Sequence, residues 1–363
     1  MKKIGMIGCG GRIGPMVCGY LAESGYEIQG GQRREPDYSK YPSNFTWKHL
    51  DVNNDEELAQ FCEGCDVVLN CSGPAYMLLE KVALAAAAAG AVYVDVSDAL
   101  AFNDEVRSRI EGKGRFYLAS GFYPGFTGLM LNKAIQSFDS VNNITGYSGG
   151  AELYSLIGCL DIIMSGTSPY CLNGYYLKDG KPVKNSMGMD YCEHELFEGK
   201  VFLKHFLSNE MYSVVKRYPP EKIKELHWYD VSSDNVIGLM AMKYYQLHDK
   251  VSFDEMYAQM GEYLQKIEKK TEEDEWAILY VFADGISGGE EKTVSIKIDL
   301  SSTSDITAYS AASAALAALE RDDPNGVYWA NQILPDNIMD IYKKRCDEKG
   351  IPCGWLYEEE FAL

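Results

Sequence analysis

The first fourteen residues constrain the fold of this chain more than any other stretch. Residues 1–7 are apolar enough for a short buried strand, a glycine-rich turn follows, and residues 15–24 can form a helix with an apolar face. A strand, a glycine turn and a helix in this order form the context in which a dinucleotide-binding fingerprint is credible. The alternative is a glycine-rich hairpin that binds no ligand.

The glycines of this turn fit two spacings. Gly8, Gly10 and Gly14 give GxGxxxG, whereas Gly8, Gly11 and Gly14 give GxxGxxG. The stricter GxGxxG pattern fails because Ile13 stands where its last glycine belongs. Under either spacing, one glycine permits a tight turn and another lets the backbone approach a pyrophosphate. The N-terminus of the following helix then offers N–H groups to the phosphates.

The next part of the chain alternates between strand-like and helix-like segments. Strands are predicted over residues 27–31, 47–52, 66–71, 91–96 and 116–120, and helices over 55–62, 75–89 and 102–111. This alternation is typical of an α/β fold with a doubly wound parallel sheet, whose ligands bind beyond the carboxyl ends of the strands. The predicted cofactor-binding residues at this edge are Gly8, Gly10, Gly11, Arg12, Ile13, Gly14, Arg33, Arg34, Asp51, Val52, Cys71, Ser72, Gly73, Pro74 and Ser97.

The residues after the second strand favour one nicotinamide cofactor over the other. Arg33 and Arg34 closely follow the strand predicted over residues 27–31. An acidic residue at this place hydrogen-bonds the ribose 2′-OH of NAD, whereas arginine pairs with the 2′-phosphate of NADP. The sequence therefore predicts NADP. Glu35 and Asp37 come just after and leave NAD possible, and a solvated basic turn is the alternative without a ligand.

The chain changes character after Thr127. Predicted helices cover residues 129–138, 153–165, 236–245 and 253–269, and strand-like alternation covers 143–148, 174–183, 193–203, 275–284 and 292–300. The dipeptide Asp179-Gly180 is a hairpin signal. These elements predict an α+β substrate-binding and dimerisation domain over residues 127–302, after a nucleotide-binding domain over 1–126. Two more helices, 305–321 and 336–349, are expected in a segment 303–363 that returns to the first domain.

Composition excludes several classes of partner. The formal net charge of −19 argues against nucleic acid or an anionic membrane as the main partner, and the longest apolar run is too short to cross a bilayer. Ten cysteines without a secretory signal fit the reducing cytoplasm, and Cys62 and Cys65 are expected to be ordinary packed or surface thiols. No histidine spacing suits a metal, so none is predicted. An open sheet in the second domain would leave a face or edge to cover, which predicts a homodimer.

Four stretches resemble the saccharopine dehydrogenase group of NAD(P)-dependent oxidoreductases. They are the glycine turn at residues 7–14, the strand and loop at 66–74, the alanine-rich helix and strand at 85–95, and Gly-Phe-Tyr-Pro-Gly at 121–125. The resemblance covers the first third of the chain, extends to the closing helices after Gly326, and finds no motif in the middle. It implies a Rossmann domain, a mixed α/β substrate domain and a C-terminal return. It also implies reduction or formation of C–N bonds, or enoyl reduction in some relatives.

The chemistry that the resemblance implies requires a proton donor. Reduction of an imine needs a protonated nitrogen, whereas the cofactor supplies the hydride. Catalytic candidates at the predicted edge are Tyr76, Asp98 and Tyr123, and His194 is the best histidine candidate in the second domain. Each has a structural alternative. A tyrosine can pack at a helix start, Asp98 can cap the helix that follows, and His194 can lie exposed at a hairpin.

The sequence thus predicts a cytoplasmic NADP-dependent oxidoreductase whose small-molecule substrate is an amino-acid-derived imine or amine. An enoyl or carbonyl reductase acting on a larger metabolite is the alternative among enzymes. A protein that senses NADP without catalysis is the alternative among binding proteins. A substrate-dependent change in NADPH absorbance distinguishes an enzyme from a sensor.

Overall fold

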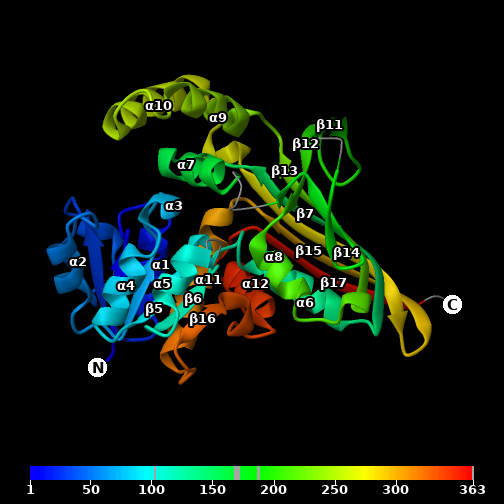
Figure 1. Cartoon of the computed structure of the whole chain (residues 1–363), viewed down its shortest axis with the longest axis horizontal. Helices are drawn as coiled ribbons and strands as arrows, with labels where there is room; N and C mark the ends of the chain where they lie inside the picture. The colour runs from blue at the N-terminus through cyan, green and yellow to red at the C-terminus, as the bar shows by residue number, and fades with distance from the viewer. Residues whose placement is uncertain (102–103, 167–171, 186–188, 362–363) are drawn as a thin grey trace. The chain divides into compact units, whose positions relative to one another are not determined.

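The chain divides into two compact units. The computed structural model describes residues 1–101, 104–166, 172–185 and 189–361. One unit contains residues 1–129 and 304–342, and the other contains residues 130–303 and 343–363 (Figure 1). The sequence placed the boundaries at residues 126 and 302 and returned the whole segment 303–363 to the first domain. Residues 343–363 lie instead in the second unit, because the last strand pairs with a strand of that unit.

The first unit is built on a seven-stranded parallel sheet, which confirms the predicted doubly wound α/β fold. Its central strand β1 (Lys3–Ile7) pairs with β2 on one side and β4 on the other, so the chain reverses its direction of winding there. The strands in spatial order are β16 (Gly326–Trp329), β6 (Arg115–Leu118), β5 (Val92–Asp95), β4 (Val67–Asn70), β1, β2 (Glu27–Gln32) and β3 (Phe45–His49).

Short helices connect these strands. They are α1 (Gly14–Ala22), α2 (Asp55–Cys62), α3 (Ala75–Leu78), α4 (Lys81–Ala88) and α5 (Asp104–Ile110), with α11 (Thr303–Leu319) supplied by the C-terminal part. Asn54 caps α2, because its side-chain oxygen accepts hydrogen bonds from Glu56 N and Glu57 N at 3.1 and 3.2 Å. The helix predicted over residues 75–89 is two helices, since Leu79 adopts a φ of 43° that no continuous helix accommodates. Residues 102 and 103 of the helix predicted over 102–111 lie outside the described residues.

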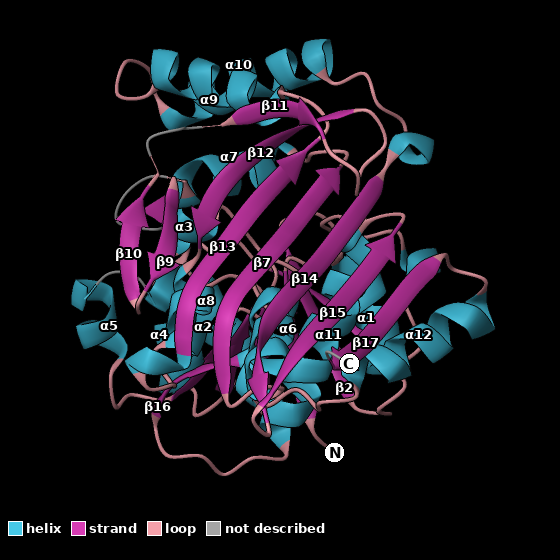
Figure 2. Cartoon of the chain, turned by 90° about the vertical axis from the view of Figure 1, so that its right-hand side faces the viewer, coloured by secondary structure: helices cyan, strands magenta, loops and turns pink. Residues whose placement is uncertain are grey.

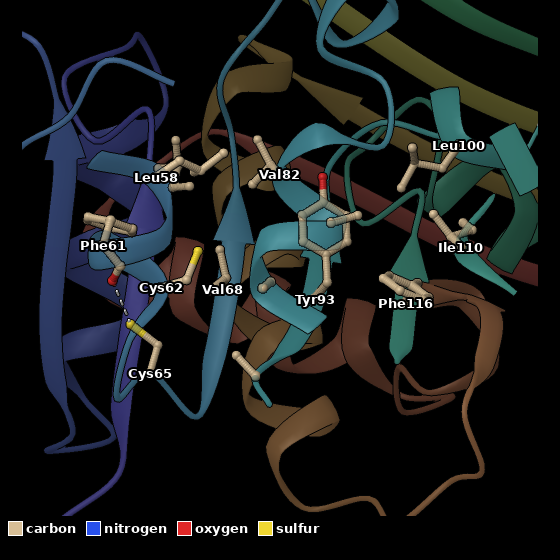
Figure 3. Close-up of a cluster of buried hydrophobic side chains, with 14 of the residues drawn as sticks. Leu58, Phe61, Cys62, Cys65, Val68, Val82, Tyr93, Leu100, Ile110 and Phe116 are labelled. Carbon is tan, nitrogen blue, oxygen red and sulfur yellow. Dashed lines mark hydrogen bonds between the residues drawn. The ribbon is translucent and has the colours of Figure 1, made fainter. Parts of the chain in front are cut away.

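The core of the first unit lies between the sheet and its helices. Phe61, Tyr93 and Phe116 are fully buried there, and fully burying an apolar side chain of this size contributes about 1.5–3 kcal/mol (Figure 3). Cys62 and Cys65 belong to this cluster, and the Cys65 thiol donates a hydrogen bond of 3.4 Å to the Phe61 carbonyl. Burial raises the pKa of Cys62 to about 12 and that of Cys65 to about 11. These thiols therefore pack in the core, where they are expected to stay protonated near neutral pH.

The second unit is built on a ten-stranded mixed sheet (Figure 2). Its main path is β10 (Lys181–Lys184), β9 (Tyr175–Lys178), β13 (Ile223–Ser232), β7 (Ser140–Ala151), β14 (Trp276–Ser287), β15 (Glu290–Leu300) and β17 (Cys353–Phe361). Beside β13, β12 (Lys200–Leu207) carries β11 (Asp190–Glu193) and β8 (Leu172–Asn173). Among the described residues of this sheet, β13 and β7 pair in parallel and all other neighbouring strands pair antiparallel.

Two hairpins of this sheet follow from their turn residues. Asp179 and Gly180 have φ values of 48° and 71°, and they join β9 to β10 as the hairpin signal predicts. Gly288 and Gly289, at 62° and 89°, join β14 to β15. The sequence predicted strands over residues 275–284 and 292–300, so both strands are longer than predicted.

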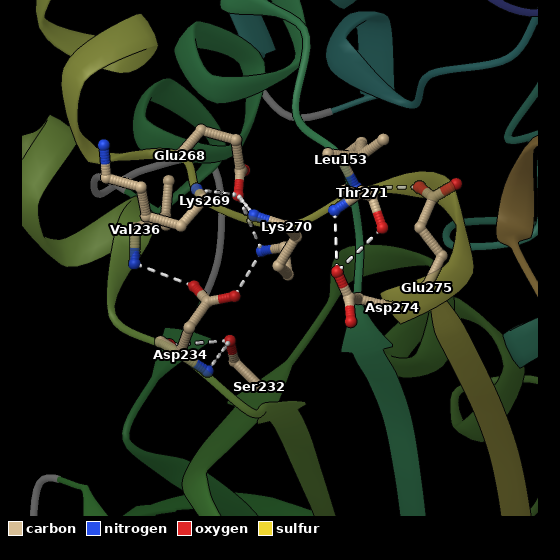
Figure 4. A network of polar contacts seen from close by, with 10 residues as sticks. All are labelled: Leu153, Ser232, Asp234, Val236, Glu268, Lys269, Lys270, Thr271, Asp274 and Glu275. Carbon is tan, nitrogen blue, oxygen red and sulfur yellow. Dashed lines mark hydrogen bonds and ion pairs between the residues drawn. The ribbon is translucent and has the colours of Figure 1, made fainter.

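Three helices of the second unit share a core of their own. These are α7 (Leu156–Ser165), α9 (Val236–Leu247) and α10 (Phe253–Ile267). The remaining α-helices of the chain are α6 (Phe126–Gln136), α8 (Asn209–Val215) and α12 (Ile338–Lys349). A polar network ties this core to the strand ends (Figure 4). The Lys270 ammonium contacts the carboxylates of Asp234 and Glu268, and Asp234 accepts a 2.8 Å hydrogen bond from Val236 N at the start of α9. The network therefore fixes α9 and the end of α10 at the end of β13.

Candidate cofactor and active site

The glycine turn after β1 has no room for side chains at two of its glycines. Gly8 adopts a φ of 83°, and a Cβ there would lie 2.7 Å from Cys71 O, at the end of β4. A Cβ on Gly14 would lie 2.0 Å from Cys9 O. Gly8 therefore permits the turn, and Gly14 permits the close approach of α1 to β1.

The open side of the same turn suits a diphosphate. Gly10, Gly11 and Arg12 are exposed, and no side chain caps the N-terminus of α1, which begins after Ile13. Uncapped N–H groups and the positive end of the helix dipole attract an anion. The Arg12 Nε donates a 2.8 Å hydrogen bond to Ser304 Oγ, which fixes this side chain against the start of α11.

Gln32, the last residue of β2, borders this turn. A Cβ built on Gly10 would overlap Gln32 Oε1 at 1.7 Å, so the amide lies against the glycine backbone. Its Nε2 donates to Arg34 O at 2.5 Å. The amide thus occupies the strand end where NAD-binding sheets carry a carboxylate, and it brings no negative charge that would repel a phosphate. The sequence prediction missed Gln32, although its place directly before Arg33 was the available signal.

The charged groups after β2 differ in what they contact. Arg33 and Arg34 are exposed, and neither guanidinium has an ion-pair partner among the described residues. Asp37 instead accepts hydrogen bonds from Ser39 N and Ser39 Oγ at 3.1 and 2.8 Å, which lower its pKa. Tyr38 has a raised pKa, first through burial and then through a hydrogen bond to Glu35. The two arginines are therefore available to a ligand, while the two acids serve the local turn.

Asp51 and Val52, which the sequence predicted to bind the cofactor, lie in the loop after β3. The strand was predicted to reach Val52, but β3 ends at His49 and the chain turns at Val52 and Asn53. The Asp51 carboxylate accepts a 2.9 Å hydrogen bond from Asn53 N, and Val52 packs against the core. A role for Asp51 and Val52 at the adenine stays a prediction.

A buried polar network joins the carboxyl ends of β4 and β5. Asn70 and Asp95 are cross-strand partners, and the Asn70 amide donates to Asp95 Oδ2 at 3.2 Å and to Tyr93 Oη at 3.1 Å. The Tyr93 hydroxyl also donates to Asp95. Asp95 Oδ1 accepts from Ser97 N at 2.8 Å, and Asn70 Oδ1 accepts from Ser72 Oγ at 2.6 Å. Burial raises the pKa of Asp95, and these hydrogen bonds oppose that rise.

This network holds the loops after β4 and β5 in place. These two loops contain most of the remaining residues predicted to bind the cofactor. Ser72, Gly73 and Pro74 follow β4, and Ser97 follows β5. Cys71 precedes them, and its N–H donates to Ile7 O at 2.9 Å. The sequence prediction did not consider Asn70 or Tyr93. A polar residue at the end of the fully buried strand β4 was the signal that identified Asn70.

Two catalytic candidates lie together at this edge. The Tyr76 hydroxyl, at the start of α3, donates a 3.2 Å hydrogen bond to Asp98 Oδ1, after β5. Their residues are only 8% and 4% exposed, so the pair is shielded from bulk water. Tyr123 lies in the turn after β6, where Gly121 N donates to Pro124 O at 3.0 Å. Strands β4, β5 and β6 are neighbours in one parallel sheet, so the loops after them share an edge.

His194 belongs to the other unit. Its Nε2 lies 3.2 Å from the Tyr147 hydroxyl and its Nδ1 accepts from Leu196 N at 3.3 Å. The ring also lies near Phe197, with centroids 5.3 Å apart. His194 therefore packs in an aromatic cluster on the larger sheet, and its catalytic role stays a prediction.

The sequence of the first unit was compared with models of protein families, and the result agrees with the geometry described above. Residues 4–111 match the model of the saccharopine dehydrogenase NADP binding domain. Residues 4–111 of the first unit are thus similar to the saccharopine dehydrogenase NADP binding domain. This match confirms the predicted resemblance and the predicted cofactor NADP. Its glycine cradle at Gly8 and Gly14, its uncapped helix and its unpaired arginines are the features of this chain that fit NADP.

Solved structures extend the comparison to the whole chain. Apo histidine-tagged saccharopine dehydrogenase (L-Glu forming) from Saccharomyces cerevisiae is 14% identical, with a TM-score of 0.66 and coverage of 100% of both chains. C. glutamicum DAP dehydrogenase in complex with DAP is 16% identical and covers 95% of this chain and 98% of its own, with a TM-score of 0.49. No curated protein sequence matches significantly. The yeast structure confirms the predicted two-part fold.

Two classes of feature are missing from the part of the chain that the structure describes. No helix there combines the length and apolar character that a membrane crossing requires. No group of three or more histidine, cysteine or acidic side chains there could hold a metal ion.

Proposed function

We propose that the protein is an NADP-dependent oxidoreductase that transfers a hydride to or from a C=N or C–N bond of a small amino-acid-derived substrate. The observation that carries the proposal is the buried Tyr76–Asp98 pair at the carboxyl edge of a sheet whose domain binds NADP. Bound NADPH supplies the hydride. The protein must then deliver a proton to nitrogen and exclude water around it.

The Tyr76–Asp98 pair contains groups that can hold and donate a proton. In imine reduction, one hydride reaches the carbon and one proton reaches the nitrogen, so the C=N bond becomes a C–N single bond. The Tyr76 hydroxyl is a donor, and the Asp98 carboxylate 3.2 Å away accepts its hydrogen bond. To act as the donor, the Tyr76 hydroxyl turns from Asp98 toward the substrate nitrogen, and its O–H bond breaks as the N–H bond forms. The phenolate then takes a proton from water before the next cycle, and the hydrogen bond to Asp98 forms again. Tyr123, on the neighbouring loop, is proposed to contact the substrate.

Substitution of the pair tests the proposal. Tyr76→Phe and Asp98→Asn are each expected to lower kcat by about 10²–10⁴-fold, with NADPH affinity within about threefold of wild type. Tyr257→Phe on α10, a tyrosine 37% exposed, is the matched control and should leave both quantities unchanged. If both variants reduce imines as fast as wild type, the pair is not the proton donor. If wild-type protein binds NADPH but reduces no imine, enone or carbonyl substrate, it is a sensor.

We also propose that the protein works as a cytoplasmic homodimer, as the sequence predicts. The nine cysteines described are all free thiols, which suits a reducing compartment. The larger sheet offers a face for a second copy. Light scattering at micromolar concentration should give twice the chain mass of 40.5 kDa, and a monomeric mass would refute the dimer.

A further inference from the structure

A lysine and an aspartate stand side by side on the larger sheet without forming an ion pair. Lys204 of β12 and Asp230 of β13 are cross-strand partners, so their Cβ atoms lie about 4.5–5.5 Å apart on one face. Asp230 is also the register partner of Ser148 on β7, and on this face Trp228 Nε1 donates a 2.8 Å hydrogen bond to Ser148 Oγ. Among the residues that the structure describes, neither charged side chain has a hydrogen bond or an ion pair. Both charges are therefore available to a ligand.

The Asp230 carboxylate is partly shielded from water. Asp230 and Lys204 are each only partly exposed. Burial raises the pKa of Asp230, and the positive charge of Lys204 opposes that rise. A carboxylate that loses water without gaining a hydrogen bond destabilises the folded protein. Such a group is suited to a ligand that supplies the missing positive charge.

The surroundings of Tyr154 distinguish Asp230 from a neighbouring aspartate. Tyr154 lies in the loop between β7 and α7, and its pKa is raised first by burial and then by the negative charges of Asp234 and Asp230. Asp234 is engaged by the protein itself, because it contacts the Lys270 ammonium and caps α9 (Figure 4). Asp230 has no such partner in the described ranges. Asp230 is therefore the acid near Tyr154 that a ligand can reach with its charge unopposed.

An aromatic pair continues the same face of β12. Phe202 stands two residues before Lys204, so both side chains lie on one face, and Phe202 is partly exposed. Tyr191 of β11 is its cross-strand partner and stacks with it, with ring centroids 4.4 Å apart. Tyr191 is 58% exposed. The two unpaired charges therefore have an accessible apolar surface beside them.

The spacing of the charges selects a class of ligand. An α-amino acid carries an ammonium and a carboxylate on one carbon, and the cross-strand pair offers the two opposite charges at a similarly short separation. A carboxylic acid without an amine would leave Asp230 unpaired, and an amine without a carboxylate would leave Lys204 unpaired. A zwitterion satisfies both side chains, and its own side chain can lie against Phe202.

We propose that Asp230 binds the α-ammonium group of an amino acid and Lys204 binds its α-carboxylate, with Phe202 beside the side chain of that amino acid. The inference rests on the proposed function, because it names the charged groups by which the second unit recognises the amino-acid part of the substrate. These three residues are called the zwitterion site. Binding at this site is measurable without hydride transfer, so the two proposals can fail separately.

Titration of the full-length protein saturated with NADP⁺ tests the zwitterion site. Saturation-transfer NMR with the standard L-amino acids finds those that bind, and isothermal titration calorimetry gives the dissociation constant of the tightest one. Asp230→Asn and Lys204→Met are each expected to raise this constant by about 10- to 100-fold, because each removes one charge-assisted contact. Glu225→Gln is the matched control. Glu225 lies on β13 but on the opposite face, where it pairs with Lys178 at 2.7 Å, so this variant should bind like wild type.

A second ligand shows whether charge or general damage to the site causes the loss. The same acid without its ammonium group should bind equally to wild type and to Asp230→Asn, since it has no charge for Asp230 to pair with. Circular dichroism checks that each variant is folded. The zwitterion site is refuted if no amino acid binds wild type, or if both variants bind as tightly as wild type. Equal weakening of the amino acid and the deaminated acid in Asp230→Asn would refute it too.

The same variants distinguish failure of the site from failure of the proposed reaction. If an amino acid binds through Asp230 but labelled NADPH transfers no hydride, the proposed reaction is wrong and the zwitterion site stands. If imine reduction proceeds with an unchanged KM in both variants, the reaction stands and the zwitterion site is wrong.

Discussion

Arg33 offers the most specific test of cofactor recognition. Its guanidinium is exposed directly after β2 and has no ion-pair partner within the described ranges, so a 2′-phosphate would gain an unopposed contact. A hydrogen bond to a charged group contributes about 1.5–3 kcal/mol. An exposed site is screened by salt, so we expect the lower part of that range, about 1.5–2 kcal/mol. Arg33→Ala should therefore weaken NADPH binding by roughly 10- to 30-fold.

Paired titrations of wild type and variant with NADPH and NADH measure this effect. NADH lacks the 2′-phosphate, so its affinity should stay within about twofold. Arg34→Ala is expected to act in the same direction, and raising the salt concentration should reduce both losses. Arg107→Ala on α5, also exposed, is the control and should affect neither cofactor. The reasoning fails if NADPH affinity is unchanged, or if NADH affinity falls as much as NADPH affinity.

Three further expectations concern the same unit. Gln32→Glu should shift preference toward NADH by about tenfold or more, measured by the same titrations, because a carboxylate at the end of β2 repels the 2′-phosphate; an unchanged ratio would contradict this. Gly14→Ala should prevent folding or abolish NADPH binding because its Cβ has no room, whereas Gly19→Ala in α1 meets nothing within 4 Å and should raise unfolding free energy by about 0.5–1 kcal/mol. The raised pKa values of Cys62 and Cys65, about 12 and 11, leave few thiolates near neutral pH. Peptide mass spectrometry should find both unalkylated in folded protein at mildly alkaline pH, and rapid labelling of either would show that its burial is wrong.

Local patterns explain what the sequence predicted well. The glycine turn could be predicted because its constraints are local. A side chain at Gly14 would clash with Cys9, five residues earlier, and one at Gly8 would clash with Cys71 after the adjacent strand. The alternation of buried strands and helices identified six of the seven strands of the first sheet, all except β16. The turn at Asp179-Gly180 was equally local.

Longer-range contacts explain what was missed. Asp95 gains its partners because β5 pairs with β4 in a register that sets Asn70 beside it, and no local pattern fixes that register. The sequence prediction recognised no strand at β13 or β17. Strand β13 mixes charged and aromatic residues, and β17 is rich in glutamate, so each becomes a strand through its neighbours in the sheet. Because β17 pairs with β15, residues 343–363 belong to the second unit.

The Tyr76–Asp98 contact lies between these cases. The sequence placed both residues at one edge of the sheet, because each follows a neighbouring parallel strand. The sequence did not predict the break of the helix after Leu78, because the alanine-rich composition of residues 75–89 favours one continuous helix.

Transfer of deuterium from NADPH labelled at C4 tests the central claim most directly. The purified protein is incubated with labelled NADPH and mixtures of amino acids with oxo acids or aldehydes, which form imines in solution, and the products are read by mass spectrometry. We predict a product with a new C–N single bond and deuterium on its carbon, formed by wild type and lost in Tyr76→Phe. Deuterium only in an enone or carbonyl product, or in no product although NADPH binds, would contradict the claim.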